Sequence, residues 1–124
     1  MGVEFLTQRD RALFGVWAVC KPANAEKVKQ IIQEELARLN TEPVSGHDLA
    51  VAKRLTTAAY ILSNQTPADR ATTLTFYDAL GNYREAKQYL ARVRAITAQD
   101  IKRVAQWYAG TPVWVTLAPQ EGKP

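Results

Sequence analysis

The sequence predicts an α+β fold in which about five helices pack on one face of a small, mainly antiparallel sheet. Three observations lead to this class. Leu13–Cys20 is uncharged and rich in β-branched and aromatic residues, which is typical of a strand with little water on either face. Val113–Leu117 has the same character near the other end of the chain. Between these two runs, apolar residues recur at helical spacing behind recognisable helix starts.

The first part of the chain predicts a β-hairpin followed by a helix. Val3–Thr7 alternates in polarity and is joined to Leu13–Cys20 by the polar link Gln8–Arg11, which favours two antiparallel strands. Asn24 is the expected N-cap of a helix over residues 25–39. The apolar residues of this helix fall on one face, and they are Val28, Ile31, Ile32, Leu36 and Leu39.

Three later helix starts share the pattern Ser/Thr-x-x-Asp. The pairs are Ser45 with Asp48, Thr66 with Asp69, and Thr97 with Asp100. At a helix N-terminus the hydroxyl and the carboxylate both satisfy free N–H groups, so we interpret these side chains as caps and not as nucleophiles or general acids. The predicted helices run over 46–62, from Pro67 to a stop at Gly81, over 83–94, and from about 98 to a stop at Gly110.

Length and composition indicate an ordinary soluble globular protein. The 124 residues, 47% apolar and 23% charged, suit one domain over residues 1–119 with a tail over 120–124. No apolar run reaches the roughly 20 residues of a membrane-spanning helix. The N-terminus does not resemble a signal peptide, and we interpret Met1 as a start placed before a fragment of a larger domain. The compartment, cytoplasmic or periplasmic in a bacterium, therefore stays open.

No set of residues in the sequence is suited to catalysis, cofactor binding or metal binding. Cys20 is the single cysteine and lies in an apolar run, so we expect a small buried side chain. His47 is the single histidine, and without a second ligand at metal-site spacing we expect it at the surface of a helix start. We assign no catalytic residue, no cofactor-binding residue and no metal ligand.

Two pairs of adjacent aromatic residues, Phe76-Tyr77 and Trp107-Tyr108, lie in predicted helices. Neighbouring side chains on a helix point about 100° apart. One member of each pair should therefore be partly exposed, as at an interface.

Three segments, taken in order, resemble the M16 metallopeptidase family of pitrilysin and the mitochondrial processing peptidase. The segments are Leu13–Cys20 followed by Lys21-Pro22-x-Asn24, then Val44-Ser45-x-x-Asp48-Leu49-x-x-Ala52-Lys53, then Ile96-Thr97-x-x-Asp100-Ile101-x-x-Val104-Ala105-x-x-Tyr108. Pro119 falls where that family often ends its last strand. The resemblance covers about residues 13–119.

The resemblance implies part of a LuxS/M16 metallopeptidase-like fold. Members of this family are built from paired α+β domains, of which one half carries a His-x-x-Glu-His zinc motif and the other helps to enclose the peptide. This chain has no His-x-x-Glu-His, so it is similar to the C-terminal portion of a domain from the non-catalytic half. The residues of that half that contact substrate lie upstream of the matching segments, so none is transferred to this chain.

These observations favour a non-catalytic segment of an M16-like zinc metallopeptidase that closes the peptide-binding chamber and is inactive alone. Zinc is expected only in the catalytic half or subunit, which would be the partner. The alternative is a non-enzymatic scaffold or interaction subunit of the same fold. Because three strands make a narrow sheet with an apolar edge, we also expect the isolated chain to form a homodimer.

Nucleic-acid binding is a third possibility, because the net charge is +4 and the pI is about 9.4. It predicts retention on immobilised DNA or RNA that weakens as salt is added. The Lys and Arg residues are scattered among acids, so we expect no retention even at low salt. Salt-sensitive retention would contradict this expectation.

Overall fold

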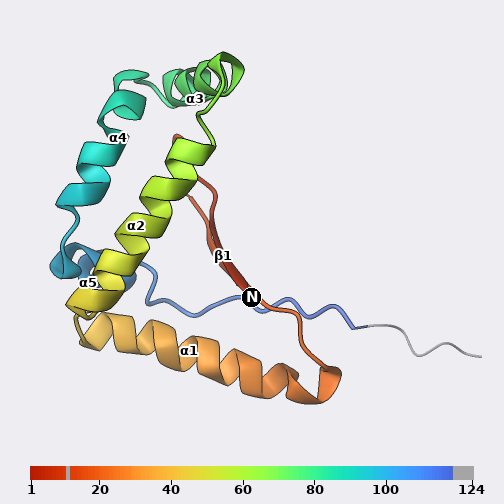
Figure 1. Cartoon of the computed structure of the whole chain (residues 1–124). Helices are drawn as coiled ribbons and strands as arrows, with labels where there is room; N and C mark the ends of the chain where they lie inside the picture. The colour runs from red at the N-terminus through yellow and green to blue at the C-terminus, as the bar shows by residue number, and fades with distance from the viewer. Residues whose placement is uncertain (11, 119–124) are drawn as a thin grey trace, which may run out of the picture.

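The computed structural model describes residues 1–10 and 12–118. Within them, five α-helices and one two-stranded antiparallel sheet form an open arrangement, which confirms the α+β class (Figure 1). The helices are α1 (Ala25–Thr41), α2 (Gly46–Leu62), α3 (Pro67–Ala79), α4 (Arg84–Ala95) and α5 (Ala98–Trp107), and a short 3-10 turn, η1 (Pro22–Asn24), precedes α1. The predicted strand end at Pro119 and the tail over 120–124 lie outside the described residues.

The predicted N-terminal hairpin is confirmed. Strand β1 (Gly2–Phe5) pairs with β2 (Phe14–Trp17), with Gly2 opposite Trp17 and Phe5 opposite Phe14. Gly2 allows the indole of Trp17 to lie close to the backbone, since a Cβ there would come within 2.7 Å of the ring. The hairpin meets the end of α5 through Tyr108, whose ring contacts those of Phe5 and Phe14.

The predicted closing strand over Val113–Leu117 is wrong for this structure. The segment is extended but belongs to no sheet, so the described sheet has two strands and not three. Trp114 in this segment lines a shallow hollow with polar residues of α1, including Lys29 and Gln33, and the segment is paired with neither described strand.

The prediction that Leu13–Cys20 is shielded from water on both faces is also wrong. Strand β2 covers only Phe14–Trp17, and exposure alternates along it, because one face looks toward Tyr108 and the other toward solvent. Cys20 is exposed and not buried, since it lies beyond the end of β2. The composition correctly indicated a strand. Within the described residues, however, no other element covers the second face of β2.

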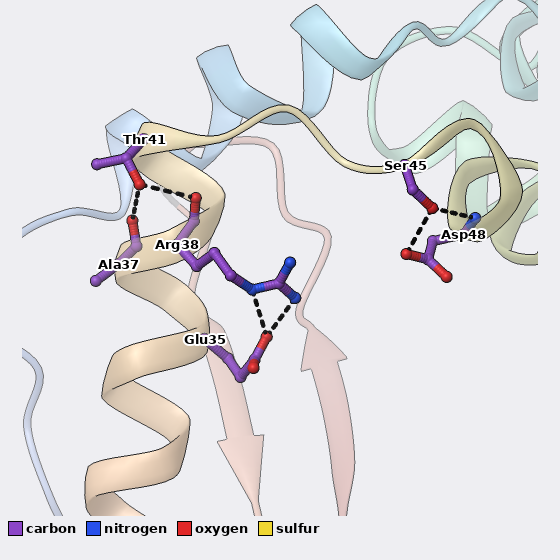
Figure 2. Close-up of polar contacts among 6 residues, drawn as sticks. All are labelled: Glu35, Ala37, Arg38, Thr41, Ser45 and Asp48. Carbon is purple, nitrogen blue, oxygen red and sulfur yellow. Dashed lines mark hydrogen bonds and ion pairs between the residues drawn. The ribbon is translucent and has the colours of Figure 1, made fainter.

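Helix starts follow the predicted capping chemistry at three of four places. The Ser45 hydroxyl accepts a hydrogen bond from the Asp48 backbone N–H at 3.0 Å (Figure 2). Thr66 and Thr97 each form a complete capping box with the Asp three residues later. Asn24 makes no such bond, because its backbone already has helical angles at the end of η1.

The capping boxes are electrostatically favourable. Hydrogen bonds from the Thr97 hydroxyl and backbone N–H, with a further one from Arg103, lower the pKa of Asp100 to about 2. The matching bonds from Thr66 lower the pKa of Asp69. Both carboxylates therefore stay ionised at neutral pH, where a negative charge at a helix N-terminus is stabilising.

Two lysines fasten the ends of helices to neighbouring helices. Lys102 on α5 donates to the Thr41 carbonyl at the end of α1 at 2.9 Å, and Lys53 on α2 donates to the Arg94 carbonyl near the end of α4 at 2.7 Å. A cation at a helix C-terminus satisfies free carbonyls and opposes the helix dipole. These bonds accompany two of the packed helix pairs, α1 with α5 and α2 with α4, and α3 also packs on α4.

The apolar core is small. Among the described residues only three apolar side chains are buried, and they are Ile32 on α1 with Ala86 and Val93 on α4. Among the described residues the helices therefore pack in three pairs, α1 with α5, α2 with α4 and α3 with α4, around few buried side chains.

Ile32→Ala should lower the free energy of unfolding by about 2–4 kcal/mol, because it removes one of the few buried side chains. Ile31→Ala is the matched control. Ile31 is the neighbouring residue of the same helix and is 47% exposed, so its loss should cost only about 0.5 kcal/mol. Urea unfolding followed by circular dichroism measures both, and equal costs would contradict the packing of α1 described here.

Candidate interaction surface

An open cavity of about 380 Å³ lies between α2, α4 and the start of α5. Its lining is mostly apolar, and its polar members are Lys53, Thr56, Glu85 and Arg92 with the phenols of Tyr77 and Tyr89. A concave apolar space with a few polar groups at its rim is the usual form of a binding site. The cavity is therefore the first place to look for a function.

The charged groups of this cavity already have partners inside the chain. Arg92 Nη2 lies 2.9 Å from Glu85 Oε1, and it also approaches the Gln88 side chain at 3.3 Å. Lys53 is bonded to the Arg94 carbonyl. The bond of Lys53 joins α2 to α4, whereas those of Arg92 lie within α4, and both uses are structural.

Three tyrosines pack between α2, α3 and α4. The rings of Tyr60 and Tyr89 stack with their centres 4.4 Å apart, and Tyr77 meets Tyr89 at 6.5 Å. The Tyr60 hydroxyl donates to the Ala86 carbonyl at 2.7 Å. Burial raises the pKa of Tyr60 and of Tyr77, because the phenolate would lose its water. The neutral phenols therefore serve as packing groups near pH 7.

The structure does not bring the other chemical residues of the sequence together. His47 is exposed in the first turn of α2, as predicted. Cys20 lies after the hairpin, and the hydroxyls of Ser45, Thr66 and Thr97 are engaged in caps. In residues 1–10 and 12–118 no three His, Cys, Asp or Glu side chains are grouped so that they could hold a metal ion.

Sequence reasoning missed the two lysines that donate hydrogen bonds to the ends of neighbouring helices. Lys53 is the last residue of the second segment that resembles the family. This position was the signal by which the sequence could have singled it out. Lys102 follows Ile101 in the third segment but is not one of its matched positions. Neither contact could be found from the sequence, because the lysine and its carbonyl partner are 41 and 61 residues apart respectively.

The main surface feature of the molecule is its exposed apolar area. The accessible surface is 10250 Å², whereas a compact monomer of 13.8 kDa exposes about 6600 Å². Large apolar side chains are open to solvent on the hairpin, on the helices and on the C-terminal segment. Leu117 and Val113 are the most exposed, at 93% and 91%, and Val115 in the same segment is 81% exposed.

The helical part of this surface includes the predicted aromatic pairs. Phe76 is exposed while Tyr77 is half-buried, and Trp107 is more exposed than Tyr108, so the expected partial exposure is confirmed. Leu55 on α2 adds a further open side chain. Surface of this extent is typical of a protein–protein contact and not of an isolated domain.

Comparison of the chain with protein-family models, with curated proteins and with solved structures found no match. None of the helices in the described residues is both long enough and apolar enough to cross a membrane.

Tyr60→Phe should destabilise the chain by about 1 kcal/mol, because it removes the hydrogen bond between α2 and α4 while it keeps the ring. It should also remove one phenol that ionises at unusually high pH. The raised pKa implies stability that is present below pH 10 and lost as the pH rises above it. Tyr83→Phe, at an exposed ring, is the control and should change neither property. Urea unfolding at neutral and at alkaline pH gives both readouts, and a Tyr60→Phe protein as stable as the wild type would contradict this contact.

Proposed function

We propose that the chain is a non-catalytic segment of an M16-like zinc metallopeptidase, which closes the peptide-binding chamber and is inactive alone. The observation that carries the proposal is the mismatch between the apolar surface and the small core. A chain that exposes about 1.5 times the surface of a compact monomer is suited to a place inside a larger protein. The family assignment rests on the order of the three resembling segments.

The roles of the matched residues support a structural contribution. Ser45 and Asp48 cap α2, and Lys53 ties α2 to the end of α4. Thr97 and Asp100 cap α5. Several positions at which the chain resembles the family thus start or join helices.

In this proposal the catalytic half or subunit supplies the zinc site and covers the exposed apolar side chains of the helices. This chain contributes a wall of the chamber, and it contributes no metal ligand. Peptide would lie between the two halves. The cavity between α2 and α4 is apolar enough to lie against a peptide, although its charged groups are engaged within the chain.

A scaffold of the same fold is the second candidate, and the same observation supports it. Exposed apolar area needs a partner, but the partner need not be a peptidase. The parent and neighbouring genes discriminate between the two candidates. A His-x-x-Glu-His motif encoded there favours the peptidase, and its absence from both favours the scaffold.

The purified chain alone should bind no stoichiometric zinc and hydrolyse no unstructured peptide. A partner that carries His-x-x-Glu-His should cleave the peptide faster when this chain is added, by at least about tenfold if chamber closure positions the substrate. The same partner with the Glu of its motif replaced by Gln is the control, and it should stay inactive with or without the chain.

Two results would contradict the peptidase proposal. One is zinc bound at one equivalent with turnover by the chain alone. The other is an active partner whose rate does not depend on the chain, which would leave the scaffold as the better explanation.

A further inference from the structure

The segment Val113–Leu117 has the properties of a strand that lacks a sheet. It forms neither helix nor sheet, its valines and leucine recur at every second position, and these side chains are almost fully exposed. Among the described residues, none of the backbone hydrogen bonds outside helices and strands involves residues 110–118. A β-branched run with free N–H and C=O groups is a template for pairing with another strand.

Strand β2 offers a matching edge. It pairs with β1 on one side, and no third strand is present in the described sheet, so its other edge is open. Its sequence, Phe14-Gly-Val-Trp17, carries no charge, whereas β1 includes Glu4. Charged residues are what usually protect an edge from pairing. The outer edge of β2 therefore has no such protection.

The area of exposed surface fits a second copy of the chain. The excess over a compact monomer is about 3600 Å². Each subunit of an obligate dimer buries about 1000–2500 Å², so a dimer would cover part of the excess and leave the rest for another partner. Each copy also has one unpaired segment and an open outer edge on β2, and a two-fold axis lets two copies pair these two features with each other.

We propose that two copies exchange their C-terminal segments, with Val113–Leu117 of each adding a third strand to the open edge of β2 in the other. The exchange completes a three-stranded sheet in each copy. It disturbs little within the chain, because the segment makes few contacts apart from Trp114 beside α1. The inference rests on the unpaired segment Val113–Leu117 and on the open edge of β2, and it does not depend on the proposed peptidase function.

Light scattering during size-exclusion chromatography tests the dimer. The wild-type chain should elute at twice its 13.8 kDa mass. Val115→Pro should give a monomer, because proline removes the central N–H of the added strand and cannot join a ladder. Leu55→Lys is the control for association through the helices and should stay dimeric, since Leu55 lies on α2 and belongs to neither of the strands that would pair. Circular dichroism should show that both variants keep their helices.

Hydrogen exchange then identifies the pairing. Amides within Val113–Leu117 and at the outer edge of β2 should exchange at least about tenfold more slowly in the wild type than in Val115→Pro. Three results would overturn the proposal. They are a monomeric wild type, a dimer lost with Leu55→Lys but kept with Val115→Pro, and protection confined to the segment, which would mean that the two segments pair with each other.

Discussion

Ile32, Ala86 and Val93 are the buried apolar side chains of the described structure, and this shortage of core is the constraint on which the rest depends. A domain of this length normally gains most of its stability from a continuous apolar interior. Here α1 packs on α5, and α4 packs on both α2 and α3, but these contacts bury few side chains. The chain therefore carries secondary structure that is well specified and a tertiary structure that leaves apolar surface open.

In a structure with so small a core, hydrogen bonds at helix ends contribute a larger share of what holds the helices in place. Lys102 and Lys53 reach the last carbonyls of neighbouring helices, and Thr66 and Thr97 close capping boxes with their aspartates. Such bonds at exposed sites are individually weak, so together they orient the helices without replacing a core. Of these residues, Lys53 and Thr97 lie at positions that resemble the M16 family, whereas Thr66 and Lys102 do not.

The exposed surface links this architecture to function. The apolar side chains on the helices and the unpaired segment Val113–Leu117 are both suited to contact with another chain. The two surfaces differ in the groups that they offer. Side chains such as Leu55 and Phe76 offer a broad helical face, which suits the cover that a catalytic half or a scaffold would provide. The segment and β2 offer backbone groups, which only another strand can satisfy. The two proposed kinds of partner would therefore use different surfaces of the chain.

The sequence by itself determined the helices, the N-terminal hairpin and the caps at Ser45, Thr66 and Thr97, because those features depend on residues a few positions apart. It was wrong about Cys20, about the cover on β2 and about a closing strand at Val113–Leu117. Whether a strand is paired or a side chain buried depends on distant segments, and composition reports only the preference for pairing and burial. Only the tertiary structure could decide that Lys53 reaches Arg94, that the three tyrosines meet, and that the C-terminal run passes α1 without meeting β2.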